Sequence, residues 1–168
     1  MKEVDARILD HRKVSSAFRV LTLSTPGLPV AKPGQFVQLL CRKPGETDPF
    51  LRRPFSVMHA RRGRLEILYK IVGRATAGMT EWRKGETVSV LGPLGNTFSR
   101  PSGPALVVAG GTGIGGVHFL LQSLKKPTLL FGVRTSAEIP RAPLRKLGVE
   151  TFVTVEDRDG LVTDRLDR

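Results

Sequence analysis

Residues 53–56 read Arg-Pro-Phe-Ser and place a cation and a hydroxyl group three positions apart on a segment predicted to be extended. Because side chains alternate along a strand, Phe55 is expected to point away from both of its neighbours. A guanidinium group can bind phosphate oxygens through paired hydrogen bonds, and a nearby hydroxyl can bond the heteroatoms of a planar ring. Taken alone, the segment favours the other interpretation, an edge arginine in a salt bridge with a carboxylate.

A second segment with possible chemistry spans residues 67–76 and ends in Gly73-Arg74-Ala75-Thr76. Tyr69 in this segment could flank a ring or a ribose, although a strand tyrosine more often belongs to the core. The last four residues are expected at the start of a helix, where backbone N–H groups attract an anion and Thr76 can act as a cap. A stiff loop, VLGPLGNTF at residues 90–98, follows.

Residues 107–116 read VVAGGTGIGG and place a run of glycines where an apolar strand turns into a helix. The first N–H groups of a helix are unpaired and its dipole is positive there, and missing Cβ atoms let a pyrophosphate approach the backbone. The spacing is not a clean GxGxxG pattern. A tight strand-to-helix turn without a ligand remains the alternative interpretation.

The elements that must position these motifs follow two patterns. Up to about residue 100, six short alternating runs separated by Gly and Pro predict strands at 4–14, 17–25, 34–42, 54–60, 64–72 and 86–92, with a helical insert at 75–85. Six short strands at this spacing indicate a closed antiparallel barrel or a sandwich.

Beyond residue 104, continuous apolar strands at 105–109, 127–133 and 149–155 alternate with helices at 116–124 and 142–148, which is typical of a doubly wound α/β domain. Residues 155–160 are interpreted as a solvated strand end. Because residues 160–168 resemble a helix with no strand after it, we expect this domain to be incomplete at its C-terminus. The predicted domains are residues 1–101 and 102–168.

Composition limits the function classes. The net charge is +12, but the basic residues are scattered and aromatic residues make up only 6%, so nucleic-acid binding is not expected. No apolar run is long enough to span a bilayer and no signal-peptide core is present, so we expect a cytoplasmic protein without membrane contact. Arg52 is interpreted as a surface or partner-facing charge.

The titratable residues predict no catalytic side chain and no metal site. Cys41 is the only cysteine, which excludes an internal disulfide and a four-cysteine iron–sulfur cluster within these residues; it is interpreted as a small core hydrophobe. His11, His59 and His118 are dispersed, and His118 is expected to be structural. No Ser–His–Asp order and no paired carboxylates stand out.

Taken in order, LRRPFS, LYKIVGRAT, VLGPLGNTF, VVAGGTGIGG and LLFGVRT resemble the ferredoxin–NADP reductase superfamily, and within it the electron-transfer subunit of type B dihydroorotate dehydrogenase. The resemblance runs from about residue 2 to residue 164. RRPFS and LGPLGN at this separation are the most specific part. The resemblance implies a six-stranded barrel that binds FAD and an α/β domain that binds NAD(H), with hydride transfer from NADH to the flavin.

The resemblance also implies which residues bind the cofactors. Arg53 would hold the FAD pyrophosphate. Pro54, Phe55 and Ser56 would line the isoalloxazine ring. The ribityl and phosphate portion would be contacted by Tyr69, Lys70 and Ile71, and the pyrophosphate by Ala75 and Thr76, with Gly73 also expected at the cofactor. The residues expected to contact NAD(H) are Gly110, Gly111, Thr112, Gly113 and Arg134.

Three departures from the family pattern are visible. Ala75 stands where the family has glycine, and Gly115-Gly116 stand where its nucleotide loop has prolines, which is expected to loosen the helix start. The family also carries four cysteines that ligate a [2Fe-2S] cluster, and these are absent from this chain.

The resulting prediction is an FAD-containing, NAD(H)-linked electron-transfer subunit in pyrimidine biosynthesis. Its implied partner is the FMN-containing dihydroorotate dehydrogenase catalytic subunit, with which the family forms a heterotetramer. Two alternatives stay open: an FAD-dependent reductase subunit of a hydrogenase or NADH:ferredoxin complex, and a non-catalytic flavin- or nucleotide-binding module.

Overall fold

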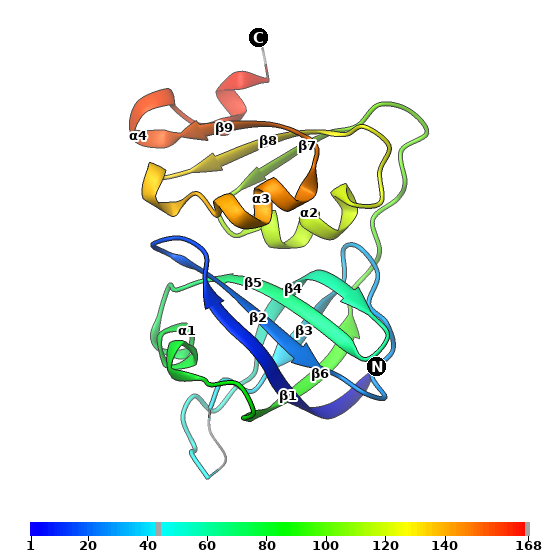
Figure 1. Ribbon diagram of the computed structural model, residues 1–168, viewed down its shortest axis with the longest axis vertical. Coiled ribbons are helices and arrows are strands. Elements are labelled where there is room, and N and C mark those ends of the chain that lie inside the picture. The colour runs from blue at the N-terminus through cyan, green and yellow to red at the C-terminus, as the bar shows by residue number, and fades with distance from the viewer. Residues whose placement is uncertain (43–44, 167–168) are drawn as a thin grey trace.

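The computed structural model describes residues 1–42 and 45–166, and its N-terminal part is a closed barrel of six antiparallel strands (Figure 1). Around the barrel the strands follow the order β1-β2-β5-β4-β3-β6. Their bounds are β1 Lys2–Lys13, β2 Phe18–Ser24, β3 Phe36–Leu39, β4 Arg53–Arg61, β5 Arg64–Lys70 and β6 Thr87–Leu94. The barrel is therefore confirmed and the sandwich alternative is wrong.

The C-terminal part is a three-stranded parallel sheet with the order β7-β8-β9. Its main elements are β7 (Leu106–Gly110), α2 (Gly113–Leu121), β8 (Thr128–Val133), α3 (Arg141–Leu147) and β9 (Glu150–Val155). In Figure 1 helices α2 and α3 lie between this sheet and the barrel. The predicted boundary at residues 101 and 102 falls in the segment between β6 and β7, and it stays a prediction.

Alternation of side chains along β5 gives the molecule two apolar cores. Leu65, Ile67 and Tyr69 point into the barrel and pack in its interior. Leu68 points away from the barrel interior. It belongs to a second apolar core with Ile114 of α2 and apolar residues of the parallel sheet. The barrel and the sheet are thus joined by a continuous apolar contact rather than by a linker alone.

The short elements are α1 (Arg74–Gly78), α4 (Glu156–Asp159) and the 3-10 turns η1 (Met79–Glu81), η2 (Ser136–Glu138) and η3 (Val162–Arg165). The prediction of a solvated strand end at 155–160 was wrong, because Asp159 accepts a hydrogen bond from the Val155 N–H and closes a helical turn there. The helix expected at 160–168 is only a 3-10 turn, and residues 167–168 lie outside the described part.

Gly115 explains why α2 can approach the barrel closely. A Cβ atom at this position would lie 3.1 Å from the carbonyl oxygen of Leu68 in β5, and one at Gly116 would lie 3.4 Å from the Ser56 hydroxyl in β4. The helix begins at Gly113 and Gly115 is buried in the contact. The two glycines therefore serve helix–barrel packing, and the expected loosening of the helix start stays a prediction.

His118 joins three elements at the same contact. Its side chain lies in α2 and is buried, and its two ring nitrogens are each 3.3 Å from a backbone carbonyl oxygen, Met58 of β4 and Pro143 of α3. A neutral imidazole can donate to only one of these carbonyls. Burial lowers the pKa of His118 below its ordinary value, which keeps the ring neutral despite the two acceptors.

Acidification is expected to destabilise the protein through this residue. The unfolded chain takes up a proton on His118 near pH 6.5, and the folded protein does so only at lower pH, so the stabilisation is complete above pH 6.5 and is lost below it. The slope can reach about 1.4 kcal/mol per pH unit. Urea unfolding at pH 7.5 and 5.5 measures it; His118→Gln should flatten the pH dependence, whereas His59→Gln, which removes a more exposed imidazole, should not. An equal slope in wild type and His118→Gln would contradict this assignment.

Candidate functional site

A cleft of about 870 Å³ follows β4 and β5 and borders the starts of α1 and α2. This volume is in the range of small-molecule sites. The predicted flavin-binding residues that line it are Arg53, Pro54, Phe55, Ser56, Tyr69, Lys70, Gly73, Ala75 and Thr76. One fold feature, the pairing of β4 with β5, thus brings two separate sequence motifs together.

Arg53 is the cation of this cleft that has no acidic partner among the described residues. Its guanidinium is half-buried and donates only to the backbone carbonyls of Leu51 at 3.1 Å and Arg52 at 3.3 Å. The other two cations in the lining are paired, Arg74 with Asp48 and Lys70 with Glu138. The salt-bridge alternative for Arg53 is therefore wrong, and its charge is available to an anionic ligand.

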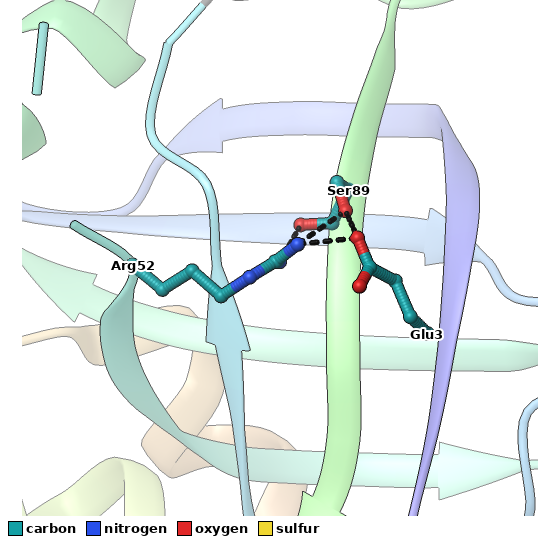
Figure 2. A network of polar contacts seen from close by, with 3 residues as sticks. All are labelled: Glu3, Arg52 and Ser89. Carbon is teal, nitrogen blue, oxygen red and sulfur yellow. Dashed lines mark hydrogen bonds and ion pairs between the residues drawn. The ribbon is translucent and has the colours of Figure 1, made fainter. Parts of the chain in front are cut away.

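Arg52, the neighbour of Arg53 in the chain, does have an acidic partner. Its guanidinium bonds the carboxylate of Glu3 and both the hydroxyl and the carbonyl of Ser89, at 2.8 and 3.2 Å, as Figure 2 shows. The side chain is 20% exposed and bound to the exposed Glu3, so Arg52 is a partly buried charge on the barrel surface; a role toward a partner stays a prediction. The hydrogen bond from Ser89 and the charge of Arg52 lower the pKa of the Glu3 carboxyl.

This network positions Arg53. Glu3 lies on β1 and Ser89 on β6, and the two strands pair with each other on the barrel wall. By binding both, Arg52 fixes the backbone immediately before β4 (Figure 2). The side chain of Arg53 therefore starts from a tethered point and is directed to the cleft.

Phe55 and Ser56 divide between the core and the cleft mouth, as alternation predicts. Phe55 is buried and packs edge-on against Tyr69, with ring centroids 6.1 Å apart. Ser56 is exposed and lies beside Gly116 of α2. The Ser56 hydroxyl thus lies at the end of the cleft where the barrel meets the α/β part. A ligand ring that contacts both parts would lie beside it.

Tyr69 is held by a histidine that the sequence did not connect to it. The Nδ1 of His11 faces the Trp82 carbonyl at 3.1 Å, so this nitrogen carries the proton, and Nε2 accepts the Tyr69 hydroxyl at 2.9 Å. The two rings are stacked, and burial raises the pKa of Tyr69. The phenol is therefore a neutral, fixed wall of the cleft.

Thr76 organises the turn at the start of α1. Its hydroxyl oxygen accepts the N–H groups of Val72 at 2.9 Å and Gly73 at 3.2 Å, and its proton is directed to the Gly73 carbonyl at 3.0 Å. These two N–H groups are thus used within the turn. An anion could bind only to the following backbone positions, so the predicted cradle is smaller than the motif indicated.

A second pocket of about 210 Å³ lies at the carboxyl ends of the three parallel strands. Gly110, Gly111 and Arg134 line it, as predicted for the nucleotide motif, whereas Thr112 and Gly113 line the larger cleft instead. Lys70 borders both spaces: its ammonium is 2.9 Å from Glu138 and lies over the ring of Phe18. The glycine turn thus forms the wall between two adjoining cavities.

Two sets of residues differ from the sequence prediction. The Ile71 side chain packs against the barrel core and does not line the cleft, because alternation puts it on the same inward face as Ile67 and Tyr69. The loop residues 48–51 and Val72 do line it and were missed. The apolar pair Phe50-Leu51 directly after Asp48-Pro49 was the available signal.

Metal chemistry has no support in the described part of the chain, where no three His, Cys, Asp or Glu side chains come together as a possible metal site. Cys41 is buried in the barrel core, and burial raises its pKa to about 11. None of the helices described is long and apolar enough to cross a membrane.

No family model matches the chain. The electron transfer subunit of dihydroorotate dehydrogenase B (NAD(+)) from Caldanaerobacter subterraneus subsp. tengcongensis is 31% identical and the match covers 96% of this chain and 65% of the relative. The subunit of the same name from Geobacillus sp. strain WCH70 is 33% identical, with 98% and 69% covered.

Among solved structures, an NADH-dependent reduced ferredoxin-NADP oxidoreductase superposes with a TM-score of 0.80 at 26% identity, covering 96% of this chain and 62% of that one. The ferredoxin-NADP+ reductase of Plasmodium falciparum gives 0.82 at 13% identity and shares the fold. The chain spans between 47% and 69% of the length of the curated relatives it matches.

Proposed function

Because the chain belongs to the family of electron-transfer subunits of type B dihydroorotate dehydrogenase, we propose that it binds FAD in the barrel cleft and NAD(H) at the carboxyl edge of the parallel sheet. In this proposal it passes electrons between NAD(H) and a dihydroorotate dehydrogenase catalytic subunit that carries FMN. The assembly of the two subunits as a heterotetramer is part of the same proposal.

Arg53 carries the proposal. It is a half-buried guanidinium that faces an 870 Å³ cleft and has no carboxylate partner among the described residues. A partly buried cation without a counter-ion loses some of its hydration, and a bound pyrophosphate would offset that loss by accepting paired hydrogen bonds. The cleft residues therefore fit a flavin dinucleotide.

The other cleft residues would position the bound flavin and form its surroundings. Ser56 lies where the cleft meets α2 and would contact the ring, and Tyr69 would flank it as a neutral wall fixed by His11. Backbone groups after Gly73 would contact the pyrophosphate. Bound FAD would supply the hydride and single-electron chemistry that no side chain of the cleft can perform.

The second pocket supports the nucleotide part of the proposal. It lies outside the carboxyl ends of parallel strands, where α/β sheets bind nucleotides, and Arg134 and Lys70 provide positive charge. The shared wall of Gly110, Gly111, Thr112 and Gly113 would allow the two bound cofactors to lie next to each other.

An iron–sulfur cluster does not fit these residues. Cys41 is the only cysteine, it is buried in the barrel core, and burial disfavours its thiolate form. No electron-transfer step through such a cluster is assigned to the residues of this chain.

The deciding experiment is anaerobic titration with FAD followed by NADH. We expect the protein to bind FAD with the absorption of a protein-bound flavin, and NADH to bleach that absorption. Absence of flavin binding would leave the non-catalytic module as the function.

A reductase subunit of another complex is the second candidate, favoured by the 26% identical NADH-dependent reduced ferredoxin-NADP oxidoreductase. Co-purification of the tagged protein from its native cells, with identification of the bound flavoprotein subunit, distinguishes it from the first candidate.

A further inference from the structure

A third groove, of about 650 Å³, is lined by residues of α3 and β9 and shares no residue with the two cavities described above. Its apolar lining includes Leu144 of α3, Val149 just before β9 and Val153 within it. The charged residues of the lining are Arg141 and Arg145, and no carboxylate of the described residues belongs to it. The groove therefore combines an apolar surface with positive charge, away from the candidate cofactor sites.

Strand β9 presents a free edge beside this groove, because the sheet order β7-β8-β9 leaves it paired on one side (Figure 1). The Val155 N–H points to the free side, where the Asp159 carboxylate accepts it at 2.9 Å. Backbone groups alternate in direction along a strand, so those of Thr151 and Val153 point to the same side. No hydrogen bond to a turn or loop of the described residues occupies them. Unpaired backbone groups in such a row can pair with another strand.

The two arginines of the groove lie on one face of α3. At positions i and i+4 they are neighbours, about 6 Å apart along the helix axis. Helix α3 connects the parallel strands β8 and β9, so it runs back alongside them. Side chains on one face of an extended segment repeat about every 6.6 Å. Two carboxylates at alternate positions of such a segment therefore match the spacing of Arg141 and Arg145.

Both arginines are free to bind a carboxylate. Their residues are exposed, and neither guanidinium has an acidic partner among the described residues. An exposed arginine alone is ordinary on a protein surface. Here the two cations, the apolar lining and the unpaired strand edge lie at one groove, and together these are the features that bind an extended peptide by strand addition.

We propose that this groove binds an extended acidic segment of a partner protein, which adds as a further strand to the free edge of β9. Its backbone pairs with Thr151 and Val153, and two of its carboxylates, one residue apart, bind Arg141 and Arg145. The net charge of +12 favours an acidic partner over a second copy of this chain, which would bring the same arginines together. The inference does not depend on a bound flavin.

A labelled peptide of the sequence Thr-Val-Glu-Val-Glu-Val-Thr-Val tests the proposal by fluorescence anisotropy with the full chain. Its two glutamates lie on one face of a strand, and we expect saturable binding. The isomer Thr-Val-Glu-Glu-Val-Val-Thr-Val places them on opposite faces and should bind more weakly. Two further peptides carry backbone N-methyl groups on alternate residues, one on each set. One of them should lose binding and the other retain it, because every second N–H of an added strand faces β9.

Arg145→Glu should weaken binding of the first peptide at least about 10-fold, because it places a like charge opposite a glutamate. Lys146→Glu is the matched control: it makes the same charge change in the same helix, and Lys146 does not line the groove. This variant should bind like the wild type. Urea unfolding should give both variants the free energy of unfolding of the wild type, since neither residue has an acidic partner to lose.

Three results would overturn the proposal. Equal affinities of Arg145→Glu and Lys146→Glu, or of the two glutamate isomers, would reduce the binding to general attraction between a basic protein and an acidic peptide. Binding that tolerates both N-methylation patterns, or no binding of the first peptide, would exclude strand addition. Concentration-dependent dimerisation of the chain in sedimentation, abolished by the first peptide, would assign the edge of β9 to a second copy instead.

Discussion

Replacing Arg53 by alanine should weaken FAD binding by about 10- to 150-fold, the equivalent of about 1.5–3 kcal/mol for a hydrogen bond to a charged group. The guanidinium is the cation of the cleft with no acidic partner among the described residues, so its removal breaks no salt bridge of the protein itself. The loss should therefore fall on ligand binding and leave the free energy of unfolding almost unchanged. Fluorescence titration with FAD and urea unfolding measure the two quantities.

Two variants make this result specific. Arg61→Ala removes the same charge from the exposed end of the same strand and should bind FAD like the wild type. Arg53→Lys keeps the charge but loses the planar fork for two phosphate oxygens, so its affinity should fall between those of wild type and Arg53→Ala. Equal FAD affinities of Arg53→Ala and Arg61→Ala would refute the role of Arg53.

Gly110→Val should lower the rate of NADH-driven flavin reduction at least about 100-fold, because a side chain there would occupy the space through which a pyrophosphate approaches the backbone. Gly110 lines only the smaller pocket, and a Cβ atom at this position would meet no protein atom within 4 Å. The free protein should thus fold normally and retain FAD. Gly113 is a less selective choice because it borders the larger cleft.

Stopped-flow reduction by NADH, compared with reduction by dithionite, tests this expectation. Gly103→Val is the control, since this glycine of the connecting segment is equally free of neighbours. It should reduce at the wild-type rate. Unimpaired reduction of Gly110→Val by NADH would contradict the nucleotide site, and loss of FAD from the same variant would indicate a folding defect.

Local patterns determined much of the fold. The alternation in residues 64–70 and the continuous apolar runs after residue 104 predicted barrel strands and parallel strands correctly. Burial on both faces holds only for the central strand β8, because Leu106 and Val108 of β7 and Phe152 of β9 are exposed. Short elements were less predictable. Residues 156–159 form a helical turn in which the Asp159 carboxylate accepts a hydrogen bond from the Val155 N–H. The spacing of apolar residues does not predict such a hydrogen bond.

Arg52 and Arg53 show most clearly what the local sequence cannot predict. Both are arginines in one short motif, and nothing local says which of them forms the salt bridge. Pairing of β1 with β6 brings Glu3 and Ser89 to Arg52, while Arg53 faces a cleft without a carboxylate partner. Partners in these contacts come from residues more than 30 positions away, and only folding sets such distances.

By itself, the sequence determined the two-part architecture and the family, because motif order and side-chain period are properties of the chain. Nine of the ten residues it predicted to bind FAD line one cleft, and their contact with FAD stays a prediction. Tertiary structure decided how these parts contact each other: Gly115 lies against the Leu68 carbonyl, His11 bonds Tyr69, and Phe50 lines the cleft. The physical reason is that close approach, hydrogen bonding and burial depend on distances between strands, and those distances exist only once the barrel is closed and α2 is packed on it.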